Sequence, residues 1–320
     1  MIFYFFRQVL LAIPALLGVL IITFLLMRAV PGDVVTQLVG IDGNVSVERM
    51  EEMRRMFGLD LPVHQQLAQW IGAALQGDLG SSLRTNRPIL QDLALRFPVT
   101  LELTILSLIV ALLIAIPLGV LAALHRGKFL DSLISSFALL GLSIPGFFLG
   151  ILLILLFSLR LGLLPPAGYV PLQESIVENL RHMILPSVSL GLVLSAAITR
   201  IVRSSMLEIL GRDYVRTARA KGLREEKLVR KYPVKIALNP LISNLGLLVY
   251  GIVAQQGLIG IVLGLPTLGP LLLNSLLAQD MILAGTILLI YATLIWISTL
   301  VSDVLLAWFD PRIRFEGSAG

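Results

Sequence analysis

The chain has 320 residues, of which 57% are hydrophobic and 14% are charged, and its formal net charge is +5. Soluble domains contain about 25% charged residues, and about 20 apolar residues cross a bilayer as a helix, so this composition excludes an ordinary soluble domain. The chain lacks cysteine, which excludes disulfides and thiolate metal sites. Its basic excess lies between apolar runs, as the positive-inside bias predicts, and does not indicate nucleic-acid binding. We therefore predict an all-α polytopic membrane protein.

Six apolar runs are long enough to be transmembrane helices. Pro31-Gly32-Asp33 breaks the helix after the first run. Pro117 and Pro145 lie inside their runs, which membrane helices tolerate when neighbours satisfy the freed carbonyls. The fourth run carries small residues, among them Gly191, which predict close helix packing. The predicted spans are about residues 9–27, 99–123, 133–157, 184–202, 241–263 and 281–307.

The longest polar region follows the first span and has nearly balanced charge, which suits a helical insertion on the external side. Ser46 is a candidate N-cap for a helix over about 47–57, and Gly58 is expected to end that helix. A second helix is predicted over 63–75. The insertion is therefore expected to be helical.

Short loops indicate the orientation of the chain, because long loops translocate largely regardless of charge. The turn 125–128 and the stretch between the fourth and fifth spans are both basic, so we predict that both, and both termini, are cytoplasmic. Further external segments are predicted at 161–183 and, as a re-entrant or interfacial stretch, at 260–283. The predicted domains are the N-terminus with the first helix (1–30), the external insertion (31–98), a five-helix core with a cytoplasmic loop (99–310, loop 204–240) and a cytoplasmic tail (311–320).

The stretch 212–240 carries nine basic and three acidic residues between two apolar runs. Asp213 is predicted to cap a short helix by accepting a free backbone N–H, and Gly222 is predicted to end it. A second helical piece is predicted to run to about Tyr232, because Pro233 prevents normal continuation. The pattern predicts a helix–Gly–helix elbow on the membrane surface.

The elbow begins Asp213-Tyr214-Val215-Arg216-Thr217-Ala218-Arg219-Ala220-Lys221-Gly222, and Pro240 follows eighteen positions later. This order resembles the cytoplasmic coupling loop of ABC importer permeases in the dipeptide, oligopeptide and nickel branch. The resemblance covers nearly the whole chain, and its shared motifs occur in the same order. They include Pro31-Gly32-Asp33, Gly77-Asp78-Leu79-Gly80-Ser81-Ser82, Pro98-Val99-Thr100-Leu101-Glu102-Leu103, Leu265-Pro266-Thr267-Leu268-Gly269 and Asp310-Pro311-Arg312-Ile313-Arg314.

In that family the elbow docks into a groove on a separate ATP-hydrolysing subunit, so the resemblance implies the same role here. A basic loop that is simply held at the cytoplasmic face is the alternative. The resemblance also implies a heteromeric complex in the bacterial inner membrane, with a second permease subunit, two ABC ATPase subunits and an external solute-binding protein. The implied ATPase-coupling residues are Asp213, Tyr214, Arg216, Thr217, Ala218, Arg219, Ala220, Lys221, Gly222 and Leu223.

Three positions depart from the family pattern. Gly260 replaces a usual acidic residue six positions before Pro266, so we expect no acidic outer-gate contact there. Arg224 replaces a serine that caps the second elbow helix, and Pro233 shortens that helix. We expect water or Glu226 to replace the cap that Arg224 cannot supply, and Pro233 to alter the fit of the elbow without abolishing it.

Motifs for catalysis are absent from the sequence. It contains no phosphate-binding G-x-x-x-x-G-K-[ST] loop and no Gly-x-Ser-x-Gly elbow. Its histidines, His64, His125 and His182, lack metal-site spacing. We expect that this chain is not an enzyme and binds no cofactor or metal, and that ATP and Mg²⁺ are bound by partner ATPase subunits.

Polar groups inside the spans are functional candidates, because hydrocarbon disfavours them. Asn244, Gln255 and Gln256 lie in the fifth span, which the family places at the pathway or the subunit interface, so they are candidates for the transport path. Adjacent glutamines cannot point the same way on a helix, and hydrogen bonding between helices is the alternative role. Glu102 and Asp303 lie near span ends and are expected to reach the interface.

The resemblance implies the permease subunit of an ATP-driven importer for short peptides. Nickel chelates, glutathione and opine-like solutes are alternatives, because the external binding protein is expected to select the solute. An ion-gradient-driven secondary transporter would instead predict mid-membrane ionisable groups and repeated broken helices. A non-transporting membrane scaffold is disfavoured by the proline- and glycine-interrupted spans.

Overall fold

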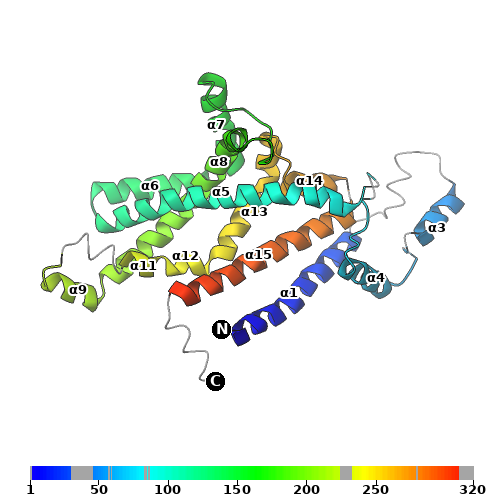
Figure 1. Ribbon diagram of the computed structural model, residues 1–320, viewed down its shortest axis with the longest axis horizontal. Helices are drawn as coiled ribbons and strands as arrows, with labels where there is room; N and C mark the ends of the chain where they lie inside the picture. Colours follow the sequence, from blue (N-terminus) through cyan, green and yellow to red (C-terminus); the bar gives the residue numbers. More distant parts are fainter. Residues whose placement is uncertain are drawn as a thin grey trace. The chain divides into compact units, whose positions relative to one another are not determined.

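The computed structural model describes residues 2–29, 46–56, 58, 60–82, 85, 87–223, 233–278 and 280–309 (Figure 1). Within these ranges the regular structure is helical, apart from one isolated β-bridge between Ser81 and Pro88. The predicted all-α class is therefore confirmed for the described residues. The chain forms two compact units, of which the first contains residues 99–269 and 295–320 and the second contains 2–98 and 270–294.

Helices are distributed over both units. The second unit contains α1 (Ile2–Ala29), α3 (Val47–Met56) and α4 (Val63–Leu75). Three helices have residues in both units: α5 (Ile89–Leu124), α14 (Leu268–Leu277) and α15 (Met281–Phe309). The first unit contains α6 (Phe129–Ser143), α7 (Gly146–Leu153), the π-helix η1 (Ile154–Arg160), α8 (Ile176–Leu210), α9 (Asp213–Ala220), α11 (Pro233–Ala237), α12 (Asn239–Ser243) and α13 (Leu245–Val262).

Four helices are long and apolar enough to cross a membrane, namely α5, α8, α13 and α15. The bent pair formed by α6 with α7 and η1 is a fifth candidate if it is counted as one span. In α1 the apolar stretch, Leu10–Ile22, is too short to be counted with these candidates. The structure therefore supports four or five of the six predicted spans.

The predicted third span, 133–157, is bent. The helical segments 129–143 and 146–160 meet at an angle of 101°. Ile144 between them has an extended backbone, with φ −94° and ψ 122°, as expected for a residue that precedes proline. Pro145 therefore ends the first segment instead of lying within one continuous helix, which corrects the prediction.

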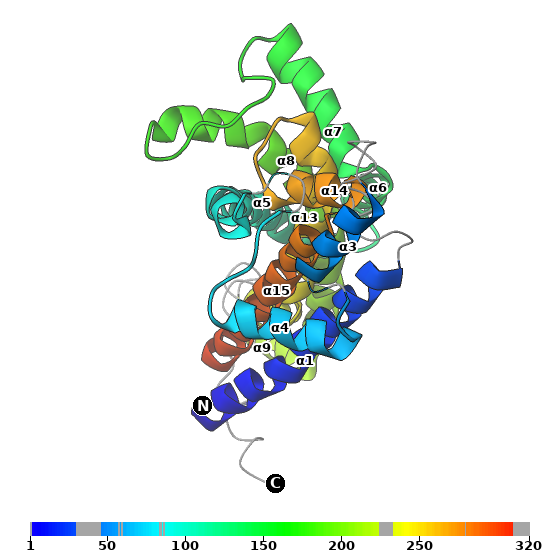
Figure 2. The same cartoon turned by 90° about the vertical axis from the view of Figure 1, so that its right-hand side faces the viewer.

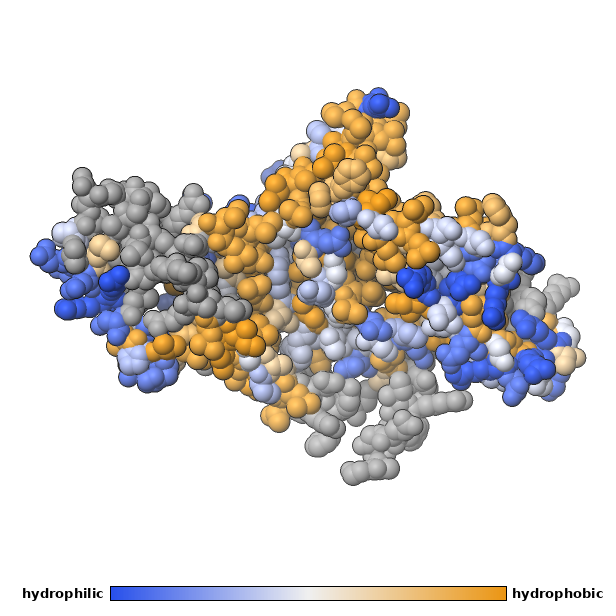
Figure 3. Space-filling model, turned by 180° about the vertical axis from the view of Figure 1, so that it is seen from behind, coloured by the Kyte–Doolittle hydropathy of each residue, from blue (hydrophilic) through white to orange (hydrophobic). Residues whose placement is uncertain are grey.

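The arm formed by α7 and η1 carries many exposed hydrophobic side chains. Figure 2 shows this arm leaving α6 at the bend, and Figure 3 shows its hydrophobic surface in orange. Phe148, Leu155 and Leu159 are among its exposed side chains. Because exposed apolar surface is unfavourable in water, the arm is suited to contact with lipid or an apolar partner.

The fourth span belongs to a longer helix than the sequence predicts. α8 begins at Ile176, so the predicted external segment 161–183 is non-helical only over 161–175. Ser175 is the N-cap, and its hydroxyl accepts a hydrogen bond from the Glu178 N–H at 3.3 Å. This bond satisfies an otherwise free amide of the first turn, which explains the early start of the helix.

α5 and α8 approach each other closely at two glycines. A methyl group at Gly119 would lie 2.6 Å from Val202 Cβ, and one at Gly191 would lie 2.6 Å from Val110 Cγ1. Small residues permit such contacts between membrane helices, and the prediction for Gly191 is confirmed. The buried core beside these contacts includes Ala111, Ala115, Ala123, Ile198, Val202, Met206 and Ile209.

The predicted fifth span is interrupted at Asn244, which lies between α12 and α13 with φ −101° and ψ 16°. The Ser302 hydroxyl of α15 donates a hydrogen bond to the Ile242 carbonyl of α12. Gly246 lies in close contact with Thr299, so a larger residue at Gly246 would collide with α15. These contacts hold the interrupted segment against α15 within the first unit.

The second unit contains the two helices predicted in the polar insertion. α3 and α4 match the predicted ranges to within one residue at each end. The Arg49 N–H donates to the Ser46 hydroxyl at 3.4 Å, as predicted for an N-cap. The Ser82 hydroxyl donates to the Asp280 carboxylate at 2.5 Å, so the segment before α5 is tied to the start of α15.

Candidate functional site

The first half of the predicted elbow is the helix α9. Its N-cap residue is Arg212, which has φ −73° and ψ 149° and makes no side-chain cap. Asp213 is the first helical residue, so the prediction that it caps the helix is wrong. Its carboxylate still lies in the first turn, where negative charge interacts favourably with the helix dipole, and 3.7 Å from the Arg216 guanidinium.

Gly222 ends α9, as predicted. Its φ is +77°, and its N–H donates to the Arg219 carbonyl at 2.9 Å. The Leu223 N–H donates to the Ala218 carbonyl at 3.3 Å, and together these bonds form a Schellman motif, which favours glycine. A methyl group at Gly222 would meet no atom of the described residues within 4 Å. Among the described residues, Gly222 therefore serves the backbone turn and makes no close helix contact.

One face of α9 belongs to the core of the first unit. Val215 is 1% exposed, and Ala218, one turn later, packs against the same cluster. This cluster includes Met206 and Ile209 near the end of α8 and Ala237 of α11. α9 is therefore packed against the end of α8 and against α11, in the last part of the stretch 212–240.

The remaining surface of α9 and the residues that follow it are exposed. Tyr214 is 45% exposed and Leu223 is 51% exposed. Tyrosine and arginine are enriched among residues that dominate binding energies at protein interfaces. The exposed members of the predicted coupling set are Asp213, Tyr214, Arg216, Thr217, Arg219, Ala220, Lys221, Gly222 and Leu223.

The second half of the predicted elbow lies outside the described residues. This part includes Arg224 and the predicted helix to Tyr232. Pro233 is the first residue of α11, a position that suits proline because the first helical N–H needs no partner within the helix. Pro240 likewise lies at the start of α12.

Gln256 links α13 to α5 and is fully buried. Its Nε2 donates to Thr104 Oγ1 at 2.9 Å and to the Thr100 carbonyl at 3.2 Å. Thr100 Oγ1 also accepts a hydrogen bond from the Leu268 N–H at 2.9 Å. This geometry favours the alternative that the sequence leaves open for Gln256, hydrogen bonding between helices.

Gln255 and Asn244 are more accessible than Gln256. Gln255 is half-buried, and its Nε2 donates to the Gly251 carbonyl at 3.0 Å. Asn244 is exposed, and its Nδ2 donates to the Pro240 carbonyl at 2.7 Å. The two adjacent glutamines therefore lie in different environments, and Gln255 and Asn244 remain candidates for the transport path.

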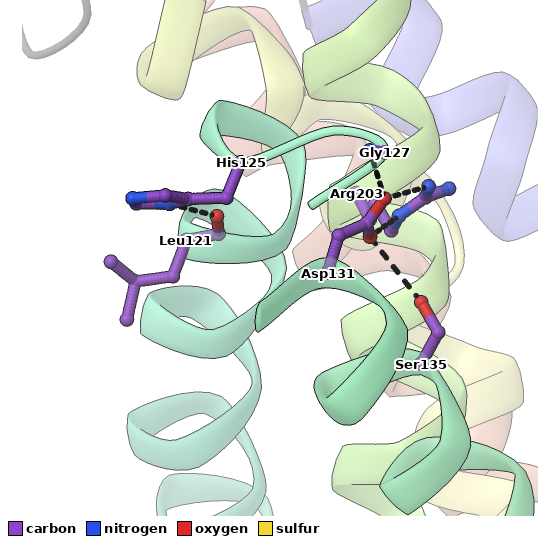
Figure 4. A network of polar contacts seen from close by, with 6 residues as sticks. All are labelled: Leu121, His125, Gly127, Asp131, Ser135 and Arg203. Atoms are coloured by element: carbon purple, nitrogen blue, oxygen red, sulfur yellow. Dashed lines mark hydrogen bonds and ion pairs between the residues drawn. The ribbon is translucent and has the colours of Figure 1, made fainter. Parts of the chain in front are cut away.

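An ion pair that the sequence analysis missed joins α6 to α8 (Figure 4). Arg203 Nε lies 2.6 Å from Asp131 Oδ1, and Arg203 Nη2 lies 2.8 Å from Asp131 Oδ2. The Gly127 N–H donates to Asp131 Oδ2 at 3.0 Å, and the Ser135 hydroxyl donates to Oδ1 at 3.4 Å. The network therefore connects the basic turn, the start of α6 and α8. The only sequence signal is an acidic residue in the first turn of α6, beside that basic turn.

Glu102 has a hydrogen-bond partner that the sequence did not predict. The Tyr169 hydroxyl donates to Glu102 Oε2 at 2.9 Å. Burial and then this carboxylate raise the pKa of Tyr169 to about 12. Because Tyr169 belongs to the 161–175 loop, the bond ties that loop to α5.

The fold is shared with a chain of a solved transporter. A chain of the MetNI methionine ABC transporter, in an inward-facing conformation, matches with a TM-score of 0.57 and 21% identity, covering 70% of this chain and 98% of that chain. This chain has four or five candidate membrane spans. Together with the structural likeness, they define it as a multi-pass helical membrane protein that shares the fold of an ABC transporter chain.

Family and sequence comparisons agree. The family described as binding-protein-dependent transport system inner membrane component matches residues 115–315, and the N-terminal family of such membrane components matches residues 1–104. A putative peptide transport system permease protein of Brucella abortus is 39% identical over 311 residues, covering 97% of this chain and 98% of the relative. The oligopeptide transport system permease protein AppB of Bacillus subtilis is 36% identical over 315 residues, covering 98% and 99%. The dipeptide transport system permease protein DppB of Escherichia coli is 35% identical over 334 residues, covering 97% and 98%. The chain belongs to the family of binding-protein-dependent transport system inner membrane components.

Proposed function

We propose that this chain is the permease subunit of an ATP-driven ABC importer and forms, with a second permease subunit, a path for short peptides across the bacterial inner membrane. The observation that carries the proposal is the two-sided helix α9. Val215 and Ala218 pack into the core, whereas Tyr214, Arg216 and Leu223 are exposed. A helix that is anchored on one face and exposed on the other suits docking to a separate ATPase subunit.

α8 is suited to transmit movement of α9 into the membrane. Its 35 residues extend over about 52 Å at 1.5 Å per residue. Met206 and Ile209, near its end, share a core with Val215 of α9. Gly119 and Gly191 mark the close contacts of α8 with α5. ATP binding to the partner subunits would shift the permease between two arrangements by favouring one position of α9.

The proposed topology has six spans, with α1 as the first span and both termini in the cytoplasm. The ion-pair network supports the placement of both basic segments at one end of the spans. Gly127 of the basic turn bonds to Asp131, which pairs with Arg203. Met206, one turn after Arg203, belongs to the cluster that contains Val215 of α9. Both segments are therefore expected on the cytoplasmic side.

Short peptides are the proposed solutes because the relatives above are named for peptide, oligopeptide and dipeptide transport. The family name supports delivery by an external solute-binding protein. ATP and Mg²⁺ would be bound by two ABC ATPase subunits, and this chain would perform no catalysis. The named relatives lend no support to nickel chelates, glutathione or opine-like solutes.

The proposed partnership is tested by gentle purification of the tagged chain from native membranes, followed by mass spectrometry of the proteins that remain bound. We expect ABC ATPases and a second multi-span protein to co-purify. The variant Arg216→Glu should reduce ATPase recovery, because it reverses a charge on the exposed face of α9. The control Arg126→Glu makes the same change at an exposed residue outside α9 and should retain the ATPases. Recovery of the wild-type chain alone, in a detergent that preserves such complexes, would favour a gradient-driven transporter.

A further inference from the structure

We propose that a groove between α6 and α8 binds the phosphate group of an anionic phospholipid. The groove has a volume of about 670 Å³, and the described residues that line it belong to these two helices. Its donors and apolar walls include Ser135, Leu139, Leu142, Arg200, Arg203 and Ser204. The groove therefore combines guanidinium and hydroxyl groups with hydrocarbon surface.

Within the described part of the chain, the groove carries one positive charge that no carboxylate neutralises. The two carboxylate oxygens of Asp131 bind Arg203 at 2.6 and 2.8 Å, which neutralises that guanidinium. Arg200 lies one helical turn earlier on α8 and is exposed. No carboxylate of the described residues forms an ion pair with it. A guanidinium beside apolar walls is stabilised by a counter-ion, so the groove is suited to an anion.

The composition of the walls indicates that this anion is a lipid headgroup. Guanidinium and hydroxyl donors match phosphate oxygens. Leu139 is 56% exposed and Leu142 is 44% exposed, and both provide surface for acyl chains. Basic pockets between membrane helices on the cytoplasmic side bind anionic headgroups. Placement of the groove in the cytoplasmic leaflet rests on the proposed topology, whereas the binding chemistry rests on the groove itself.

A lipid in this groove would stabilise the packing of α6 against α8, because it would contact both helices beside their ion pair. Its phosphate would neutralise Arg200, and its acyl chains would cover the exposed leucines. The bound state should therefore unfold less readily than the lipid-free state, since ligands that bind the folded state stabilise it by mass action.

The test measures thermal unfolding of the full-length chain with its bound partners, titrated with vesicles of phosphatidylglycerol or of phosphatidylcholine. We expect phosphatidylglycerol to raise the unfolding temperature and phosphatidylcholine to have little effect. Arg200→Gln should weaken the apparent affinity for phosphatidylglycerol at least tenfold. The matched control Arg126→Gln removes the same charge from an exposed residue that does not line the groove, so it should retain wild-type affinity.

Equal losses in the two variants would overturn the proposal, because they would indicate general attraction between basic residues and an anionic surface. An equal stabilisation by inorganic phosphate would also overturn it, by indicating a small-anion site.

A photoreactive phosphatidylglycerol provides a measurement on the wild-type chain if Arg200→Gln does not fold. Labelling is expected within 135–142 and 197–204, and labelling confined to other segments would contradict the assignment. All of these readouts measure binding without ATP or peptide, so failure of the proposed transport function would not alter them.

Discussion

Asp131 and Arg203, which are 72 residues apart, form a two-point ion pair with N–O distances of 2.6 and 2.8 Å. The Asp131 side chain is 7% exposed and that of Arg203 is 30% exposed. The pair joins the start of α6 to α8, one turn before Met206 enters the core that holds α9. It is therefore positioned to connect α6 with α8, the helix proposed to transmit movement of α9.

Loss of this pair should destabilise the first unit. Asp131→Asn removes the negative charge and leaves Arg203 without its ionic partner. We expect a loss of about 1–3 kcal/mol in the free energy of unfolding, the usual range when a buried polar partner is removed. The measurement is denaturant unfolding in detergent. Glu208→Gln is the control, because the Arg212–Glu208 pair is exposed and such pairs contribute about 0–1 kcal/mol.

A charge swap separates the ion pair from other effects of substitution. The double variant Asp131→Arg with Arg203→Asp should be more stable than either single variant, because the charges are again complementary. Recovery should be partial, since the Gly127 N–H and the Ser135 hydroxyl lose the carboxylate that accepts their bonds. Additive losses in the double-mutant cycle would show that the pair contributes no interaction energy.

Substitution of Gly222 should uncouple ATP hydrolysis from uptake. Its φ of +77° is unfavourable for residues with a Cβ, by roughly 1–2 kcal/mol. Gly222→Val should therefore alter the end of α9 and reduce peptide uptake per ATP hydrolysed in reconstituted vesicles. Gly222→Asn should be milder, because asparagine tolerates this conformation better.

Gly162 provides a matched control for this experiment. It also has a positive φ, +63°, and a methyl group there meets no atom of the described residues within 4 Å. Gly162→Val should carry a similar backbone penalty while leaving transport coupled, because Gly162 lies in the loop after η1. A comparable loss of coupling in both variants would contradict a specific role for the end of α9.

The contact between α5 and α8 should be intolerant of a single methyl group. In Gly191→Ala the new carbon would meet Val110 Cγ1 at 2.6 Å and the Ser107 carbonyl oxygen at 3.0 Å. Overpacking of this kind costs about 1–3 kcal/mol, which thermal unfolding would detect. The control is Gly251→Ala, where the nearest atom, Leu194 Cδ1, is 3.9 Å away. Equal stability of the two variants would refute the close contact.

Tyr169 should titrate at about pH 12, because burial and then the Glu102 carboxylate raise its pKa above the ordinary value of 10.0. A raised folded-state pKa means that its contribution to stability is complete below pH 10 and is lost as the pH rises through 12. Ultraviolet difference titration of wild type against Tyr169→Phe isolates this phenol. Glu102→Gln should lower the pKa only in part, since burial remains, and titration near pH 10 in the wild type would contradict the assignment.

Local signals in the sequence predicted several features because their causes lie within a few residues. Ser46 caps α3 through an amide three residues away. Gly222 ends α9 because one left-handed residue completes bonds within the same turn. The same reasoning assigns the N-cap to Asp213, whereas the N-cap residue is Arg212. Arg212 has the extended backbone of an N-cap, but its side chain makes no capping hydrogen bond.

Other features could not be read from local sequence. Gln255 and Gln256 are chemically identical neighbours, yet only Gln256 meets Thr104 of α5. The chain contains many arginines, and Asp131 pairs with Arg203 because α6 packs against α8. Pro145 is compatible with either a tolerated kink or a break, and the sequence alone does not distinguish these from the 101° bend that the structure shows.

The membrane class, the positions of most helices and the turn at the end of α9 follow from the amino-acid order alone, because apolar length and local hydrogen bonding are properties of contiguous residues. Three features required the three-dimensional packing: Val215 faces the core while Tyr214 is exposed, Arg203 binds Asp131, and Arg200 lines a groove without an ionic partner among the described residues. These outcomes depend on the packing of α6, α8 and α9, whose contacts join residues far apart in the chain.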